Sequence, residues 1–504
     1  MSEMDSAAPP QEVELKLAIA SPSARDVADR EVGRAQPRSV ETIYYDTPGR
    51  RLHSAGYSLR LRRDGEAWSQ SVKAANGVSR FEQDFQLRGA MPDFSLLQGT
   101  PIAAMVDTSL APVFVTRVQR RSRRRDTSGG RIEFSLDEGE VIAHDRSWPI
   151  HELELELKAG EPEALFDEGR RLAEDNAFVP DFMSKAERGF ALADGMLGEP
   201  VKFGARPLAA GTTASAAFQT LARRCLRQLS LNAELIAGAG RLEAVHQART
   251  ALRRLRVAMN SFKDLLDHGR LEALKGELKW LTGELADARN IDVLLVETFE
   301  PRANEFIDRA AATAFGKVLL HAQERAHERA RAALASSRFR LLLLDAARWV
   351  EGDVRPNLGP RQADPPIEAF AAKALERRRR TLKKRLEVLD WDDPYERHKV
   401  RIAAKKMRYE AEFFLDLGPK SRADSYKPFV KTLAKLQDGL GGLNDLTVAE
   451  PMVPELLTRA AAPDAERVAY AAGLIVGRDL ACARKLTKSA KRASKAFLGT
   501  PTWW

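Results

Sequence analysis

Two short stretches of the chain alternate between charged and hydrocarbon side chains at every second position. The first is Glu12-Val-Glu14-Leu-Lys16, and the second is His151-Glu152-Leu-Glu154-Leu-Glu156-Leu-Lys158. Because successive side chains of a β-strand point to opposite faces, each stretch predicts a strand with one charged face and one apolar face. A face of carboxylates around a lysine is electrostatically unfavourable unless cations or a ligand occupy it. The pattern therefore indicates a site for metal and phosphate.

Short runs bounded by turn residues predict further strands in the first 200 residues. These runs are Ser39–Tyr45, Ser58–Arg63, Ala67–Ala74, Arg80–Gln86, Val113–Arg121, Arg131–Leu136 and Ile150–Lys158. Their spacing favours an antiparallel barrel or sandwich. Basic residues recur along them, and inward-facing charges of a closed barrel would line a tunnel where arginines bind phosphate and carboxylates hold metal. Ordinary solvated strand faces are the alternative for any one strand.

The period changes to that of amphipathic helices beyond residue 211, in long Ala-, Leu- and Arg-rich stretches. These stretches are Phe218–Leu235, Arg241–Leu266, Leu271–Asp287, Phe370–Leu389 and Tyr395–Leu417. Residues 195–213 are rich in Gly, Pro and Ala and mark the expected boundary. The predicted fold class is α+β in two domains, with strands in residues 1–200 and an all-α domain in residues 211–504.

The helical region contains an internal repeat. His246-x-x-Arg249-x-x-x-Arg253-Arg254-Leu-Arg256 returns 152 residues later as His398-x-x-Arg401-x-x-x-Lys405-Lys406-Met-Arg408. We therefore expect two related helical bundles, about residues 211–350 and 367–504, joined by the Pro- and Gly-rich segment 352–366.

Each copy of the repeat places one histidine and three cations on one stripe of a helix, within about 80° of arc. The stripes are His246, Arg249, Arg253 and Arg256, and His398, Arg401, Lys405 and Arg408. A single charged stripe is usually a solvated helix face, but its recurrence favours a shared anion that offsets the repulsion among the cations. The histidines would add charge near or below pH 6.5. His321 and His327 are expected to be solvated.

The net charge of +9 is unevenly distributed. Residues 1–200 carry 26 Lys and Arg against 34 Asp and Glu, a net charge of −8, whereas residues 201–504 carry 54 against 37, a net charge of +17. The C-terminal part should therefore attract polyanions. Nucleic acid is the less favoured polyanion, because few aromatic residues interleave the stripes and no nucleic-acid-binding fingerprint is visible.

Cysteine usage and hydropathy indicate the compartment. The two cysteines, Cys225 and Cys482, cannot form a disulfide framework, which suits a reducing environment. No apolar run approaches the length of a membrane span, and the N-terminus lacks the features of a signal peptide. We expect a cytoplasmic protein without a membrane partner, and no pattern predicts its oligomeric state.

The order of motifs along the first 190 residues resembles the CYTH family of triphosphate tunnel enzymes. The motifs are Glu12-x-Glu14-x-Lys16, Tyr44-Tyr45-Asp46-Thr47-Pro48, Leu59-Arg60-Leu61-Arg62, Lys73, Arg80-Phe81-Glu82, Glu152-x-Glu154-x-Glu156-Leu157-Lys158 and Ser184-Lys185-Ala186-Glu187-Arg188-Gly189. The resemblance implies an eight-stranded antiparallel β-barrel with flanking helices, whose tunnel binds a triphosphate with a divalent metal.

The resemblance also implies roles for individual residues. Those expected to hold Mg²⁺ or Mn²⁺ are Glu12, Glu14, Glu152, Glu154 and Glu156. Those expected to bind the phosphate chain are Arg60, Arg62, Lys73, Arg80 and Arg117. Those expected to take part in catalysis are Glu14, Lys16 and Lys185.

The strand register around Arg117 stays open. Arg117 and Arg121 share one strand face, Arg120 lies on the other, and a bulge would reverse the choice. Asp137 either faces inward or lies in a turn.

The repeat of histidine and basic residues resembles the CHAD domain, a helical family associated with binding of inorganic polyphosphate. Its presence favours an inorganic substrate for the tunnel. The expected function is metal-dependent hydrolysis of tripolyphosphate to pyrophosphate and phosphate, with polyphosphate bound by the helical domain. The alternatives are a class IV-type adenylyl cyclase, a thiamine triphosphatase, or a noncatalytic protein that binds polyphosphate.

Overall fold

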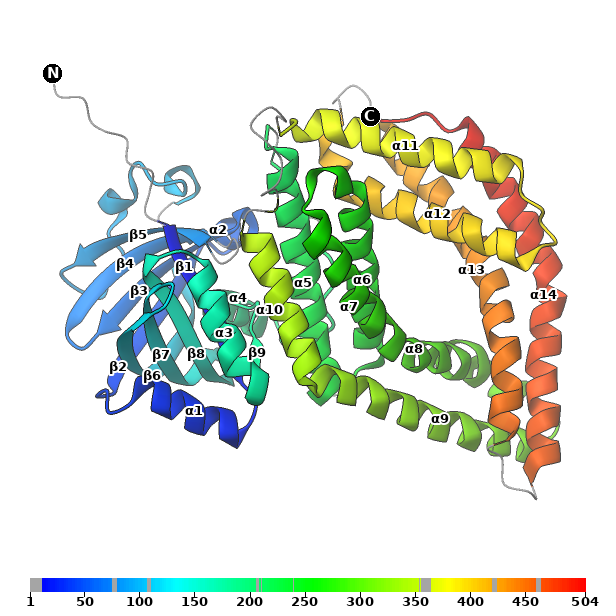
Figure 1. Cartoon of the computed structure of the whole chain (residues 1–504), viewed down its shortest axis with the longest axis horizontal. Helices are drawn as coiled ribbons and strands as arrows, with labels where there is room; N and C mark the ends of the chain where they lie inside the picture. Colours follow the sequence, from blue (N-terminus) through cyan, green and yellow to red (C-terminus); the bar gives the residue numbers. More distant parts are fainter. Residues whose placement is uncertain are drawn as a thin grey trace. The chain divides into compact units, whose positions relative to one another are not determined.

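The structure is a computed structural model that describes residues 11–74, 79–106, 110–204, 208–209, 211–238, 240–352, 354, 364–418, 424–458 and 464–504. The chain forms two compact units. The first unit comprises residues 1–200 and 334–353 and contains the strands, whereas the second comprises residues 201–333 and 354–504 and is helical (Figure 1). The predicted combination of an N-terminal antiparallel sheet and a C-terminal helical region is confirmed.

The first unit is built on one antiparallel sheet. Its strands are β1 (Gln11–Ile19), β2 (Arg38–Asp46), β3 (Tyr57–Asp64), β4 (Ala67–Ala74), β5 (Ser79–Leu87), β6 (Ala111–Thr127), β7 (Gly130–Ala143), β8 (Arg146–Gly160) and β9 (Phe178–Pro180). They are ordered β5-β4-β3-β2-β6-β7-β8-β1-β9. Each strand expected from the sequence is present, and β9 is an addition.

The expected eight-stranded barrel is wrong: the sheet has nine strands in the described part of the chain and does not close as a regular barrel. The reason lies in β1, which divides its hydrogen bonds among three neighbours. Residues 11–13 pair with β5, residues 14–18 pair with β8, and residues 17–19 pair with β9. Among the described residues, the end strand β5 therefore pairs with β1 over three residue pairs.

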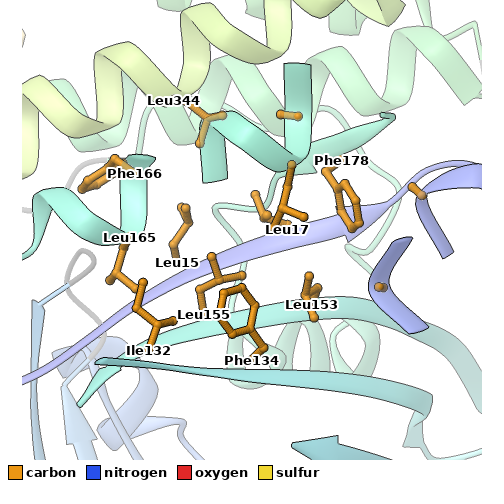
Figure 2. Packing of buried hydrophobic residues seen from close by; sticks show 14 of the residues in the cluster. Leu15, Leu17, Ile132, Phe134, Leu153, Leu155, Leu165, Phe166, Phe178 and Leu344 are labelled. Atoms are coloured by element: carbon orange, nitrogen blue, oxygen red, sulfur yellow. The ribbon is translucent and has the colours of Figure 1, made fainter. Parts of the chain in front are cut away.

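The apolar face of β1, β7 and β8 packs against helices. Figure 2 shows this core, in which Leu15 and Leu17 of β1 lie near leucines of β8. Three helices cover it, namely α1 (Pro22–Val32), α3 (Glu163–Asp175) and α10 (Ser337–Glu351). Because side chains alternate along a strand, Glu14, Lys16 and Glu154 point to the opposite, charged face of the sheet.

Two smaller cores support the remaining strands. Leu59 and Leu61 of β3 and Val72 of β4 pack with Leu52 of α2 (Arg51–Ala55). The same core contains Leu97 of the 3₁₀ helix η1 (Phe94–Leu97) and Ile102, which directly precedes the 3₁₀ helix η2 (Ala103–Met105). Val113 and Phe114 of β6 pack with Phe190 and Leu192 of α4 (Lys185–Ala193). In β1 and β8 the leucines thus lie beneath helices, whereas Glu14, Lys16 and Glu154 share the other face.

The segment 334–353 departs from the expected division of the chain. The sequence assigned it to the helical domain, but α10 belongs to the first unit, where it contacts α3 and β9. Leu344 and Ala347 of α10 lie in the same core as Leu15.

The second unit contains the remaining helical elements. They are α5 (Ala214–Gly238), α6 (Leu242–Ser261), η3 (Lys263–Leu265), α7 (His268–Glu284), α8 (Ala286–Asp292), the π-helix η4 (Val293–Phe299), η5 (Glu300–Glu305), α9 (Arg309–Ala335), α11 (Ile367–Glu387), α12 (Pro394–Phe413), η6 (Leu415–Leu417), α13 (Tyr426–Leu457) and α14 (Ala465–Gly499). None of the described helices is both long and apolar enough to cross a membrane.

Four phenylalanines at the centre of the second unit reflect the internal repeat. Phe218 and Phe262 correspond, at the offset of 152, to Phe370 and Phe414. The Phe262 ring lies 4.3 Å from that of Phe370 and 6.1 Å from that of Phe414, centroid to centroid. The two halves therefore meet through equivalent aromatic side chains.

Candidate functional site

A charged cavity of about 520 Å³ lies in the first unit. Most of the residues predicted to form the tunnel line it, namely Glu14, Lys16, Arg60, Arg62, Lys73, Glu154, Glu156 and Lys185. The structure adds further charged residues, namely Arg38, Asp64, Glu82, Asp84, Arg120, Glu133, Lys158 and Glu187. The cavity thus has the mixture of cations and carboxylates that phosphate and metal require.

Three buried carboxylates form a cluster at the base of this site. Asp137 of β7 pairs in register with Glu152 of β8, and Glu154 lies two residues further along the same strand face. One oxygen from each of the three lies within 4.8 Å of the others. The open question about Asp137 is therefore resolved, because its side chain is fully buried among these carboxylates.

Lys185 neutralises part of the charge of this cluster. Its Nζ lies 2.7 Å from Asp137 Oδ2 and 2.8 Å from Glu154 Oε1, and it also contacts Glu152. Arg120 adds a second cation, since its Nε and Nη2 donate to Asp137 at 2.6 and 2.5 Å and Nη2 lies 2.5 Å from Glu154 Oε2. Five charged groups therefore form one connected network.

The network keeps Glu154 and Lys185 ionised at neutral pH. Burial alone would raise the pKa of Glu154, but attraction from Lys185, Arg120 and Lys16 holds it well below its usual range. Burial likewise acts to lower the pKa of Lys185, and the surrounding carboxylates Asp137, Glu152 and Glu154 outweigh it and raise that pKa. Glu154 and Lys185 therefore act as fixed charges rather than as proton donors or acceptors.

A helix start positions Lys185. Ser184 caps α4 by accepting a hydrogen bond from the Glu187 backbone, and the Glu187 carboxylate accepts one from the Ser184 backbone in return. Lys185 is the first residue of the helix, so the cap fixes its direction toward the carboxylates. One turn later, Arg188 contacts Asp181 at 2.6 Å and Glu152 at 3.3 Å.

The opposite part of the cavity is basic. Glu82 bridges two of its cations, at 2.8 Å from Arg60 and 2.6 Å from Lys73. Among the described residues, Arg62 makes no hydrogen bond or ion pair, and its Nε is buried without a partner. Repulsion from Arg60, followed by burial and by Arg120, lowers the pKa of Arg62. A guanidinium in this position gains stability when an anion binds beside it.

A second set of carboxylates crosses three neighbouring strands. Glu156 of β8 pairs in register with Glu14 of β1 on one side and with Glu133 of β7 on the other, and all three line the cavity. Cross-strand neighbours of like charge repel each other, so a cation beside them is favourable. Glu133 was not predicted, although its alternation with Ile132 and Phe134 places it on the same strand face as Asp137.

Both carboxylate sets fit a hard divalent cation. Their donors are exclusively oxygen atoms, which Mg²⁺ and Mn²⁺ prefer, and three of these oxygens lie within 4.8 Å. The residues that could hold such an ion are Glu14, Asp137, Glu152, Glu154 and Glu156.

The structure does not bring every predicted residue to the cavity. The side chain of Arg117 is 62% exposed and pairs with Glu41, whereas Arg120 lines the cavity. Of these two arginines the structure therefore brings Arg120, and not the predicted Arg117, to the cavity. The backbones of Glu12 and Arg80 pair between β1 and β5, but their side chains lie outside the described part of the structure.

The basic stripes lie on neighbouring helices of the second unit. His246, Arg249, Arg253 and Arg256 are on α6, and His398, Arg401, Lys405 and Arg408 are on α12. Arg253 Nε donates to the Tyr409 hydroxyl at 3.4 Å, and Arg254 contacts Glu412 at 2.6 Å. The two copies of the repeat thus meet along α6 and α12.

Burial and neighbouring cations lower the pKa of two of these basic residues. Burial, followed by repulsion from Arg289, lowers the pKa of His246 to about 4. Burial, followed by Arg253 and Arg289, lowers the pKa of Arg249 to about 10. His246 is therefore neutral near pH 6, contrary to the expectation that it adds charge near its ordinary pKa. His398 is exposed, and its Nδ1 lies 2.7 Å from Asn444 Oδ1.

His327 differs from its expected solvated state. It is 5% exposed, and its Nε2 lies 2.8 Å from Asp292 Oδ1, which also accepts a hydrogen bond from Gln323. The carboxylate partner is 35 residues away in sequence, so the helical pattern around His327 could not reveal it. His321 is exposed as expected.

Comparisons with known protein families match both parts of the chain. A model of the CYTH domain matches residues 10–190, and a model of the CHAD domain matches residues 220–453.

Individual proteins are similar to parts of the chain. An inorganic triphosphatase from Haemophilus influenzae is 30% identical over 193 residues, which cover 36% of this chain and 55% of that protein. The chain thus spans about half the length of this relative. The crystal structure of the CHAD domain from the plant Ricinus communis is 28% identical and covers 60% of this chain and 98% of that domain, with a TM-score of 0.52. PptA from Streptomyces chartreusis is 21% identical and covers 57% of this chain and all of that one, with a TM-score of 0.44.

Proposed function

Because the chain combines a CYTH domain with a CHAD domain, we propose that its first unit hydrolyses inorganic triphosphate to pyrophosphate and phosphate. The observation that carries the proposal is Arg62, a half-buried arginine beside Arg60 whose Nε is buried without a partner among the described residues. A phosphate chain supplies the anion that this arginine lacks. The similarity to an inorganic triphosphatase supports the same substrate class.

In this proposal the basic residues of the cavity bind the phosphate chain. Arg60, Arg62, Lys73 and Arg120 donate hydrogen bonds to nonbridging oxygens and offset the charge that develops on them during in-line attack by water. Glu14 orients the attacking water by accepting a hydrogen bond from it. Lys16 contacts Glu14 at 3.2 Å and, with Lys185, keeps the carboxylates of the cavity ionised and in place.

The acidic residues hold a divalent cation, Mg²⁺ or Mn²⁺, in this proposal. When bound, the ion neutralises phosphate charge and helps to orient the triphosphate. The residues proposed to hold it are Glu14, Asp137, Glu152, Glu154 and Glu156, together with Glu12 as expected from the sequence.

We assign binding of longer polyphosphate to the basic surface along α6 and α12. Lys406 of α12 supports this assignment, because burial and repulsion from Arg378, Arg385 and Arg256 lower its pKa. Cations from three helices therefore converge there, and a linear polyanion relieves their repulsion.

An organic triphosphate is a second candidate substrate, favoured by aromatic residues in the cavity. His53 and Tyr57 line the cavity, and the His53 ring stacks on Phe190 with centroids 4.2 Å apart. A nucleobase or a thiamine ring could stack in the same way. This candidate includes the adenylyl cyclase and thiamine triphosphatase alternatives.

Phosphate release from tripolyphosphate, ATP and thiamine triphosphate tests the proposal, each measured with Mg²⁺, with Mn²⁺ and with EDTA. We expect tripolyphosphate to be hydrolysed fastest, and only when a divalent cation is present. Faster turnover of an organic triphosphate, or formation of cyclic AMP, would favour the second candidate. Binding of polyphosphate without hydrolysis of any triphosphate would support the alternative of a noncatalytic protein that binds polyphosphate.

A further inference from the structure

The helix α10 lies at the end of the first predicted half of the helical repeat, within the match to the CHAD domain, yet it belongs to the first unit. There it contacts α3 and β9. Its residues Leu344 and Ala347 are almost completely buried in the core that also contains Leu15 and Leu17 of β1 (Figure 2). The hydrophobic core behind the candidate site is therefore incomplete without a segment encoded about 150 residues after the sheet.

Polar contacts on both edges of α10 fix its position on α3. Arg170 Nη1 donates to both carboxylate oxygens of Asp345, at 2.8 and 3.0 Å, and Arg348 contacts Asp167 at 2.5 Å. The buried Arg340 donates from Nε to the backbone oxygen of Ala173, 3.2 Å away. In one ion pair α3 supplies the arginine, and in the other α10 does. Together with the hydrogen bond from Arg340 to the backbone of Ala173, the two pairs define one register between the helices.

Gly169 of α3 lies between Leu344 of α10 and Leu15 of β1, the strand that carries Glu14 and Lys16. A Cβ on Gly169 of α3 would lie 2.5 Å from Leu15 Cδ2 and 3.3 Å from Leu344 Cδ2. The side chains from β1 and from α10 thus both lie close to the backbone of α3 at this point. Leu15 is flanked in sequence by Glu14 and Lys16, which point into the cavity.

We propose that α10 is a positioning element of the triphosphatase site, because Leu344 supports β1 through α3 and thereby fixes Glu14 and Lys16. The inference rests on the proposed function for its activity readout. The cations that bind phosphate are supported separately, because Leu59, Leu61 and Val72 pack in a different core. Disturbing α10 should therefore affect kcat much more than KM.

Three full-length variants test this. Leu344→Ala removes the support, and Gly169→Ala inserts a methyl group between the same layers, so both displace β1 by opposite changes in volume. Leu343→Ala is the matched control, since Leu343 is fully buried on the same helix but lies outside this core. We expect kcat for tripolyphosphate to fall about tenfold to a hundredfold in the first two variants, because small displacements of catalytic groups are costly. KM should change by less than about threefold, and the control should keep most of its kcat.

Hydrogen–deuterium exchange of peptides covering residues 11–19 provides a readout that does not depend on activity. Each variant is measured below its own melting temperature. Leu344→Ala should accelerate exchange in β1, whereas Leu343→Ala should leave it close to that of the wild type. Equal losses of kcat in Leu344→Ala and Leu343→Ala, or unchanged exchange in β1 of Leu344→Ala, would overturn the proposal. A wild-type protein that hydrolyses no triphosphate would instead refute the proposed function, and the exchange measurement would still test the role of α10.

Discussion

Arg62 and Arg63 are adjacent arginines with opposite surroundings. Arg62 lines the cavity half-buried and without a partner among the described residues, whereas Arg63 is exposed and its Nε donates to the backbone of Gly65. We expect Arg62→Ala to lower kcat/KM for tripolyphosphate by about 100-fold to 1,000-fold, as the loss of one donor to a developing oxyanion does elsewhere. Arg63→Ala should stay within about twofold of the wild type, within ordinary mutational scatter. Phosphate-release kinetics distinguish the two, and equal losses would argue against Arg62 as a phosphate ligand.

His246 gives polyphosphate binding a dependence on pH. Its pKa of about 4 means that it is neutral in the free protein at pH 5.5 to 7, and a bound polyanion favours its charged form. Binding should therefore tighten as the pH falls from 7 to 5.5, by up to about tenfold per pH unit for one proton taken up.

Isothermal titration calorimetry in two buffers of different ionisation enthalpy, at constant salt, measures this proton uptake. His246→Gln should take up less than the wild type. Identical uptake in the two proteins would show that the exposed His398, or another group, is responsible.

At single residues, the sequence predicted the composition of the site better than its register. Period-two alternation identified Glu14, Lys16 and Glu154, because their leucine neighbours reveal the opposite face. The same rule could not choose between Arg117 and Arg120, since basic residues occupy both faces of β6 and its pairing with β2 shifts at Tyr44 and Tyr45. A slip of one residue exchanges the faces of a strand.

Among the elements, α4 carries a catalytic candidate on its first turn. Ser184→Ala removes the cap and should destabilise the protein by about 1 kcal/mol, whereas Ser184→Thr keeps a hydroxyl acceptor and should restore most of the loss. Because Lys185 follows the cap directly, Ser184→Ala should also lower kcat several-fold, an amount typical of small shifts in a catalytic group. Urea denaturation and phosphate release measure the two effects. A loss of stability with unchanged kcat would indicate that the carboxylates alone position Lys185.

The longer elements could be read from the sequence, but their partners could not. Hydrophobic periodicity located the longer strands and helices such as α5, α6, α7, α11 and α12 because each presents one apolar face, but it did not single out α9, α13 or α14. The strand β9 has only three residues, too few to show a period. The helix α10 is amphipathic like its neighbours in the chain, and nothing in its own pattern specifies that its leucines pack behind β1.

For the whole molecule, two sites in different units should be separable by mutation. Glu14→Ala should abolish tripolyphosphate hydrolysis and leave polyphosphate binding intact. The double variant Arg253→Ala/Lys405→Ala should weaken polyphosphate binding by about tenfold to a hundredfold, as loss of two phosphate contacts implies, and keep the hydrolysis rate. Phosphate release and polyphosphate titration at fixed salt measure the two activities. Loss of both activities in either well-folded variant would contradict the two-site proposal.

The division of the whole chain into a sheet and a repeated helical region followed from period and repeat, which are properties of the sequence alone. Closure of the sheet did not, because it depends on hydrogen bonds between β1 and three other strands. The resemblance to a known family led to the expectation of a regular barrel. The structure differs from that expectation at β1, which pairs with three other strands.

The separation of the two faces of the sheet has a consequence for how such a protein can change over generations. Alternate residues of β1 and β8 have different surroundings, since Leu15 and Leu155 hold the strands against helices while Lys16 and Glu154 line the charged cavity. A substitution on the charged face leaves the leucines that hold these strands in place, whereas a change in the apolar packing shifts the charged residues as well. Natural selection can therefore alter the ligand without endangering the fold, and descendants of one ancestral sheet can diverge in chemistry while their leucines remain in place.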